Sequence, residues 1–167
     1  MPDTFVKIAT VTVGSGGATS LEFSSIPSTY TDLCIKLSPR STNSSATYGA
    51  TIQFNSSTSN FSYRALYGNG SSAGSYSDTA TWLGEVPAAT STSNTFGNVE
   101  IYIPNYAGST YKSFSIDNVG ENNATAARAD LIAELWSNTA AITNIKVESA
   151  VNFAQYSTAT LYGISKS

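Results

Sequence analysis

Apolar and polar residues alternate along most of this chain of 167 residues. The first alternating segment, residues 5–13, is rich in β-branched side chains and ends at the glycine-rich residues 14–17. A period of two is typical of β-strands with one buried face, and clusters of Gly, Ser, Asn and Pro are typical of the turns between them. Similar segments follow at residues 21–23, 33–37, 48–54, 61–65, 99–103, 114–116, 145–147 and 159–163. Together they predict about eight to ten short strands.

Short strands separated by turns, without long helical patterns between them, predict an all-β protein. The spacing favours an antiparallel sandwich or barrel over repeated strand–helix–strand units. The length is that of one ordinary domain, so we expect a single domain over residues 1–167.

Residues 124–136 fit two kinds of secondary structure. The pairs Leu131/Leu135 and Ile132/Trp136 are spaced as on one side of a helix, and the composition slightly favours a helix. The segment also alternates as a strand does, with one face formed by Ala127, Ala129, Leu131, Ala133 and Leu135. The family resemblance described below favours the strand, which is our prediction.

Residues 68–97 are dominated by Gly, Ser, Thr and Ala, and they predict a surface excursion with one short strand near Trp82. A connection of this length inside a compact domain usually serves a function. Aromatic rings in such a segment can stack on sugars or contact other proteins. Tyr76 and Trp82 are therefore the candidate interaction surface.

The chain carries unusually few charges. Only 11% of its residues are Asp, Glu, Lys or Arg, against about 25% in typical soluble domains. Ser, Thr and Asn cover the surface instead, and such short side chains lose little conformational entropy at a contact. With a net charge of −3 and eight scattered basic residues, the chain offers no basic patch for a phosphate backbone. We therefore expect protein partners and no nucleic acid.

The residues needed for common enzyme chemistry are absent from the sequence. The chain has no histidine and a single cysteine, which excludes Ser-His-Asp and Cys-His systems and argues against a zinc site. Cys34 lies in an apolar run, where a buried and inert thiol is expected. Residues 117–123 carry several oxygen ligands but lack the spacing of a calcium loop, and they predict a turn. We expect no enzyme activity, no cofactor and no metal, although a pair of carboxylates for glycoside hydrolysis stays formally possible.

Several stretches resemble a family of short bacteriophage virion proteins. They follow in order along nearly the whole chain, at residues 8–14 (IATVTVG), 21–33 (LEFSSIPSTYTDL), 54–55 (FN), 60–64 (NFSYR), 66–68 (LYG), 135–145 (LWSNTAAITNI), 152–154 (NFA) and 157–164 (STATLYGI). The resemblance implies a jelly-roll-like β-sandwich and a virion role without catalysis. Relatives include capsid decoration proteins and the distal domains of tail or fibre proteins.

The sequence favours the first of these two roles. The chain opens with neither a secretory signal nor a membrane-spanning segment, and it reaches a predicted strand by Phe5. We therefore expect no fibre shaft, and attachment through the surface of the domain itself. The resulting hypothesis is a capsid decoration (cement) protein that bridges subunits of the major capsid protein, as a homotrimer on the virion surface, assembled in the host cytoplasm. The alternative is a tail or fibre domain, receptor-binding or adaptor, that recognises a host surface glycan.

Overall fold

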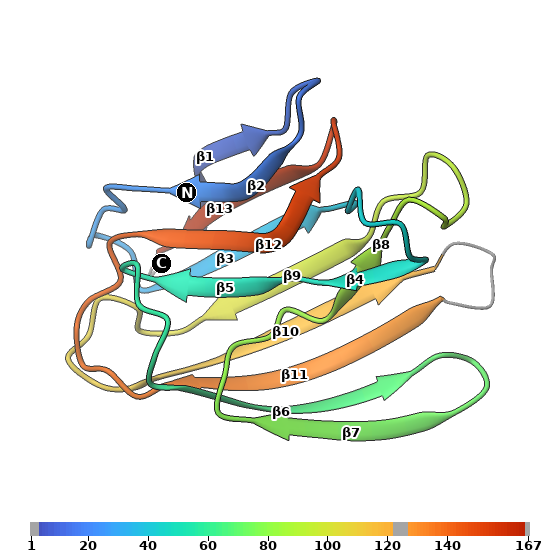
Figure 1. The fold of residues 1–167 in the computed structure, drawn as a ribbon. Coiled ribbons are helices and arrows are strands. Elements are labelled where there is room, and N and C mark those ends of the chain that lie inside the picture. The colour runs from blue at the N-terminus through green and yellow to red at the C-terminus, as the bar shows by residue number, and fades with distance from the viewer. Residues whose placement is uncertain (1–3, 122–126, 166–167) are drawn as a thin grey trace.

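The computed structural model describes residues 4–121 and 127–165, and these residues form thirteen strands and no helix (Figure 1). The all-β prediction is confirmed. The strands are β1 (Phe5–Thr12), β2 (Ala18–Phe23), β3 (Asp32–Ser38), β4 (Thr47–Gly49), β5 (Thr51–Phe54), β6 (Phe61–Gly68), β7 (Ala73–Asp78), β8 (Glu85–Pro87), β9 (Asn98–Ile103), β10 (Lys112–Gly120), β11 (Arg128–Trp136), β12 (Ile145–Phe153) and β13 (Thr158–Ile164).

The strands form an antiparallel, jelly-roll-like β-sandwich with layers of unequal size. One layer is an eight-stranded sheet in the order β1-β13-β3-β9-β10-β11-β6-β7. The other contains the three-stranded sheet β2-β12-β5 and the short pair β4-β8. Figure 1 shows the three-stranded sheet in front of β3 and β9, whereas β11, β6 and β7 extend beyond it. The large sheet is thus covered by a second sheet over only part of its inner face.

The core lies between the two layers and follows the alternation seen in the sequence. Ile35, Ile101 and Leu161 of the large sheet and Ile52 and Val147 of the small one are fully buried in one cluster. Two facing sheets bury alternate residues of each strand, which is why a period of two identified these positions.

The apolar face expected over residues 48–54 is divided between two sheets. β4 ends at Gly49 and pairs with β8, whereas β5 begins at Thr51 and pairs with β12. Between them the backbone of Ala50 turns to the excursion: its carbonyl accepts a hydrogen bond from the Leu83 amide at 2.8 Å, and its amide donates to the Gly84 carbonyl at 3.3 Å. Backbone hydrogen bonds to Leu83 and Gly84, which are distant in the chain, therefore interrupt the expected strand at Ala50.

Residues 128–136 form a strand, β11, as predicted, and residues 124–126 lie outside the described part of the chain. β11 pairs with β10 on one side and β6 on the other, so its backbone is fully engaged in the sheet. Its inner face is mixed, because Ile132 and Trp136 are buried in the core there beside two acidic residues. Leu131 points to solvent and is 59% exposed, whereas Asp130 and Glu134 are buried on the inner face.

The excursion of residues 68–97 contains two short strands, β7 and β8, and Trp82 lies in neither. The prediction of one short strand near Trp82 is therefore right in part: β8 begins three residues after Trp82, but β7 is a second strand, and the amide of Trp82 itself donates to a side chain of β11. The turn predicted at residues 117–123 is also wrong over residues 117–120, which belong to β10. Residues 14–17 do form a turn, closed by the Gly17 amide on the Gly14 carbonyl at 3.1 Å. Cys34 is buried, as expected.

Candidate functional site

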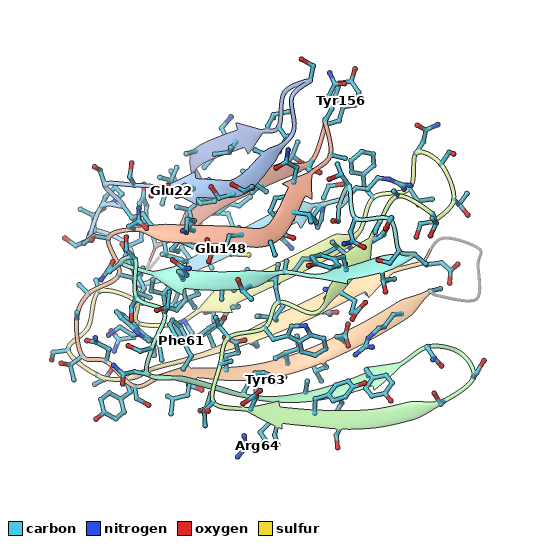
Figure 2. The ribbon with its side chains drawn as sticks, viewed as in Figure 1. Glu22, Phe61, Tyr63, Arg64, Glu148 and Tyr156 are labelled. Carbon is cyan, nitrogen blue, oxygen red and sulfur yellow. The ribbon has the colours of Figure 1, made fainter. Side chains whose placement is uncertain are left out.

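The structure brings Tyr76 and Trp82 together in an aromatic cluster on the inner face of β6 and β7. Their ring centroids lie 5.8 Å apart, edge to face. Tyr67 stacks on Tyr76 at 4.9 Å, and Tyr63 packs against Trp82 at 5.6 Å. We use "aromatic cluster" for these four residues, of which Tyr63 is labelled in Figure 2. They cover the part of the large sheet that extends beyond the three-stranded sheet.

Arg128 completes the aromatic cluster from the first residue of β11. Its guanidinium carbon lies 4.3 Å from the ring centroid of Tyr67, 5.3 Å from that of Trp82 and 5.5 Å from that of Tyr76. These distances are in the range of cation–π contacts. Its Nε donates to the Oδ1 of Asp130 at 2.8 Å, so the positive charge is compensated locally.

Tyr63, Tyr67 and Arg128 were not identified from the sequence as members of the cluster. The alternation that placed Tyr63 and Ala65 on one face of a strand extends to Tyr67, so the two tyrosines could have been paired. Gly74, directly opposite Tyr67 on β7, leaves room for the ring, since a Cβ at this position would lie 2.7 Å from a ring atom. Nothing local in the sequence identified Arg128.

A buried carboxyl group on β11 fixes the position of Trp82. Oε1 of Glu134 accepts a hydrogen bond from the Trp82 amide at 2.6 Å, and Oε2 lies 3.2 Å from the hydroxyl of Thr81. Burial raises the pKa of Glu134 from 4.5 to about 8. The carboxyl is therefore largely neutral at pH 7, and a hydroxyl such as that of Thr81 can either donate to it or accept its proton.

Two further buried polar residues hold the segment that follows Trp82. Oδ2 of Asp130 accepts a hydrogen bond from the Glu85 amide at 3.4 Å, and Nδ2 of Asn118 donates to the Leu83 carbonyl at 2.9 Å. Burial raises the pKa of Asp130, and its hydrogen bond with Arg128 opposes this effect. These bonds explain why β10 and β11 turn polar side chains inward. Residues 81–85 cover the inner face of the two strands, and their buried backbone N–H and C=O groups need hydrogen-bond partners.

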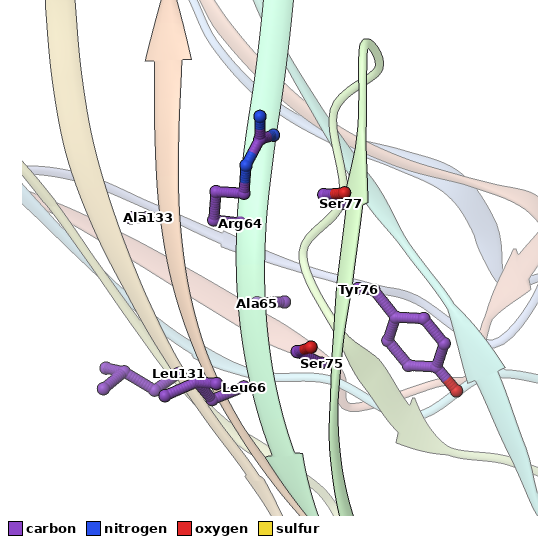
Figure 3. A pocket seen from close by; sticks show the side chains of 8 residues that line it. All are labelled: Arg64, Ala65, Leu66, Ser75, Tyr76, Ser77, Leu131 and Ala133. Atoms are coloured by element: carbon purple, nitrogen blue, oxygen red, sulfur yellow. The ribbon is translucent and has the colours of Figure 1, made fainter.

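The opposite, outer face of the same strands carries exposed apolar side chains. Leu66 of β6 and Leu131 of β11 are direct cross-strand neighbours and are 62% and 59% exposed. They line a shallow pocket of about 480 Å³ together with Arg64, Ala133 and the small side chains of Ser75 and Ser77. Figure 3 shows the two leucines close together, whereas the Tyr76 ring points away from them. We call Leu66, Leu131 and Ala133 with their serine neighbours the outer apolar patch.

Neither surface is assembled like a metal centre. Within residues 4–121 and 127–165, no group of three or more acidic, cysteine or histidine side chains could hold a metal ion. The same residues include no helix of a length and hydropathy suited to crossing a membrane. The two surfaces offer stacking, apolar contact and hydrogen bonding, which are the interactions of binding sites.

Comparison with known proteins says nothing about the two surfaces, so their role has to be inferred from their own residues. The chain matches no family model, no curated protein sequence and no solved structure. The resemblance to phage virion proteins therefore stays a hypothesis, supported by the residues quoted for it.

Proposed function

We propose that this protein is a structural component of a bacteriophage particle, a capsid decoration protein that binds neighbouring capsid subunits. The observation that carries the proposal is the outer apolar patch. Leu66 and Leu131 stand exposed beside each other on the outer face of the large sheet, near its edge strand β7, while the carboxyl groups of Asp130 and Glu134 are buried behind them.

The exposed leucines favour a partner that covers them. Burying a leucine side chain contributes about 1.5–3 kcal/mol, and in the isolated domain this contribution is largely missing at both positions. The surrounding Ser75, Ser77 and Ala133 are short, so they lose little side-chain entropy at an interface. Apolar side chains among small neutral ones fit a protein surface, and the net charge of −3 opposes binding to nucleic acid.

The proposed partner is the major capsid protein, and the proposed assembly is a homotrimer. A symmetric oligomer placed on a symmetric lattice multiplies weak contacts of each copy into a high avidity. A small patch on each subunit would then suffice for stable attachment.

The proposal is tested with phage particles assembled without this chain. Purified protein is added back, binding to heads is measured by sedimentation, and genome release on heating is followed with a DNA-binding dye. Wild-type protein is expected to bind and to raise the release temperature. The double variant Leu66→Asp, Leu131→Asp should lose binding at least tenfold, since it places two charges in the contact.

The matched control is Tyr156→Asp, which introduces a charge at an exposed residue in the turn between β12 and β13, at the opposite end of the molecule (Figure 2). This variant should bind like the wild type. The proposal is wrong if wild-type protein does not bind heads, or if particles lacking it keep their thermal stability and lose adsorption to the host.

A second candidate function is recognition of a host surface glycan by a tail or fibre component. The aromatic cluster supports it, because grouped rings with a nearby arginine offer stacking surfaces for sugars. Binding to a glycan array by the wild type, weakened in Trp82→Ala or Tyr76→Ala, would favour this function. Binding to heads without glycan binding would favour decoration.

A further inference from the structure

A second pocket, which shares Trp82 with the aromatic cluster, lies between β4, β5 and β12. It has a volume of about 530 Å³, and its walls include the rings of Tyr48 and Trp82. Volumes of about 300–1,000 Å³ are usual for sites that bind small molecules. The ring of Tyr48 comes from β4 and that of Trp82 from the connection between β7 and β8, so the fold brings together two aromatic walls from separate segments.

The indole nitrogen of Trp82 stands beside a glycine. Gly49 lines the same pocket, and a Cβ built on it would lie 3.5 Å from Nε1 of Trp82. The missing side chain leaves space next to the indole N–H, which is a hydrogen-bond donor.

Two polar side chains of β12 complete the pocket. Ser149 is only 8% exposed, and its Oγ has no hydrogen-bond partner among the described residues. Because this oxygen is itself enclosed by the protein, we assign it no contact with a ligand in the pocket. Beside it, the Glu148 carboxylate is held by the ammonium group of Lys146 at 2.7 Å and by the amide of Gln53.

The charge of the pocket is balanced. Glu148, labelled in Figure 2, is the acidic residue of the lining, and its ion pair with Lys146 on the same strand compensates it. A charged ligand would therefore gain little from the site. A neutral molecule with hydroxyl groups could donate to Glu148 while it packs against the rings.

We propose that this pocket binds one pyranose ring of a neutral saccharide. The C–H face of the sugar lies against Trp82 and Tyr48, and its hydroxyl groups bond to Glu148 and the indole N–H. The proposal rests on the second candidate function, glycan recognition, and it assigns the specific contact to this pocket and not to the side of the aromatic cluster formed by Tyr67 and Tyr76.

The experiment uses the full chain on an array of neutral and acidic oligosaccharides, followed by calorimetric titration of the glycan with the strongest signal. Tyr48→Ala, Trp82→Ala and Glu148→Gln are each expected to weaken binding of a neutral glycan about tenfold. Tyr111→Ala removes an exposed ring outside the pocket and is the control, whereas Tyr67→Ala removes a ring of the aromatic cluster that does not line the pocket. Tyr111→Ala should keep the wild-type affinity, Tyr67→Ala should weaken binding less than Tyr48→Ala does, and circular dichroism verifies the fold of every variant.

The outcomes distinguish a wrong pocket assignment from a wrong assignment of glycan recognition. If the wild type binds glycans and Tyr67→Ala abolishes binding while Tyr48→Ala and Glu148→Gln do not, glycan recognition stands and the pocket assignment is wrong. If the wild type binds no glycan on the array, both the pocket assignment and the second candidate function are wrong. Preference for acidic glycans would also overturn the assignment of a neutral sugar.

Discussion

Replacement of Glu134 by glutamine tests whether a buried, largely neutral carboxyl anchors the segment around Trp82. Glutamine has nearly the same shape and stays neutral at every pH. Its Oε1 can accept the hydrogen bond from the Trp82 amide, and its Nε2 can donate to the hydroxyl of Thr81. The variant should therefore keep the native contacts and remove only the titration.

The expected magnitude follows from the pKa of Glu134. Burial raises this pKa from 4.5 to about 8 in the folded protein. Between these two values the unfolded chain gives up the proton while the folded chain keeps it, so a rise in pH favours unfolding. One unit of pKa corresponds to 1.36 kcal/mol, so about 5 kcal/mol of wild-type stability is lost between pH 4.5 and pH 8. A loss of this size is large against typical domain stabilities of about 5–15 kcal/mol.

The assay is urea unfolding of wild type and Glu134→Gln, followed by circular dichroism at several values between pH 4 and pH 9. Near pH 4 the two proteins should have similar free energies of unfolding. The variant should then become progressively more stable than the wild type up to about pH 8, and the difference should stay constant above it. Glu22→Gln, the same chemical change at an exposed position of β2, provides the baseline. A difference between wild type and Glu134→Gln that does not change with pH would refute the reasoning.

Two further predictions concern backbone strain and the thiol. Gly84 has a φ of +91°, and a Cβ there would lie 2.4 Å from Nδ2 of Asn118, so Gly84→Ala should destabilise the protein by about 1–3 kcal/mol in urea unfolding. Gly16→Ala, with no atom within 4 Å of its Cβ, is the control, and equal losses would contradict this account. Cys34 is 1% exposed, and burial raises the pKa of its thiol, so a disulfide reagent should label it slowly in the native protein and rapidly in urea. Rapid labelling of the native protein would show that this part of the sheet opens.

The alternation of residues was sufficient to predict the strands and much of the core. Ile35, Ile101 and Val147 lie where a period of two places them, and they are buried as expected. The glycine-rich turn at residues 14–17 could also be predicted from neighbouring residues alone, because Gly17 adopts a φ of +70° that other residues rarely take. Such features depend on near neighbours in the chain, so they can be recognised without knowledge of the rest of the fold.

Only part of the candidate surfaces could be predicted from the sequence. Trp82 and Tyr76 stood out because they interrupt a segment of small residues, and the structure places them in contact. The partners that define their surroundings, Arg128 and Glu134, come from β11, some fifty residues further along the chain. Their arrangement depends on the pairing of β11 with β6, which involves residues far apart in sequence.

By itself, the sequence determined that this chain forms antiparallel strands with a sparsely charged surface, because alternation and composition are properties of the chain. It determined which side chains share a face of β11, but not which face is covered. The tertiary structure decided that Leu131 is exposed and that Asp130 and Glu134 are buried. The physical reason is that residues 81–85 lie over the inner face, where the amides of Trp82 and Glu85 bond to the two carboxyl groups. Leaving these amides buried without a partner would cost more free energy than exposing one leucine.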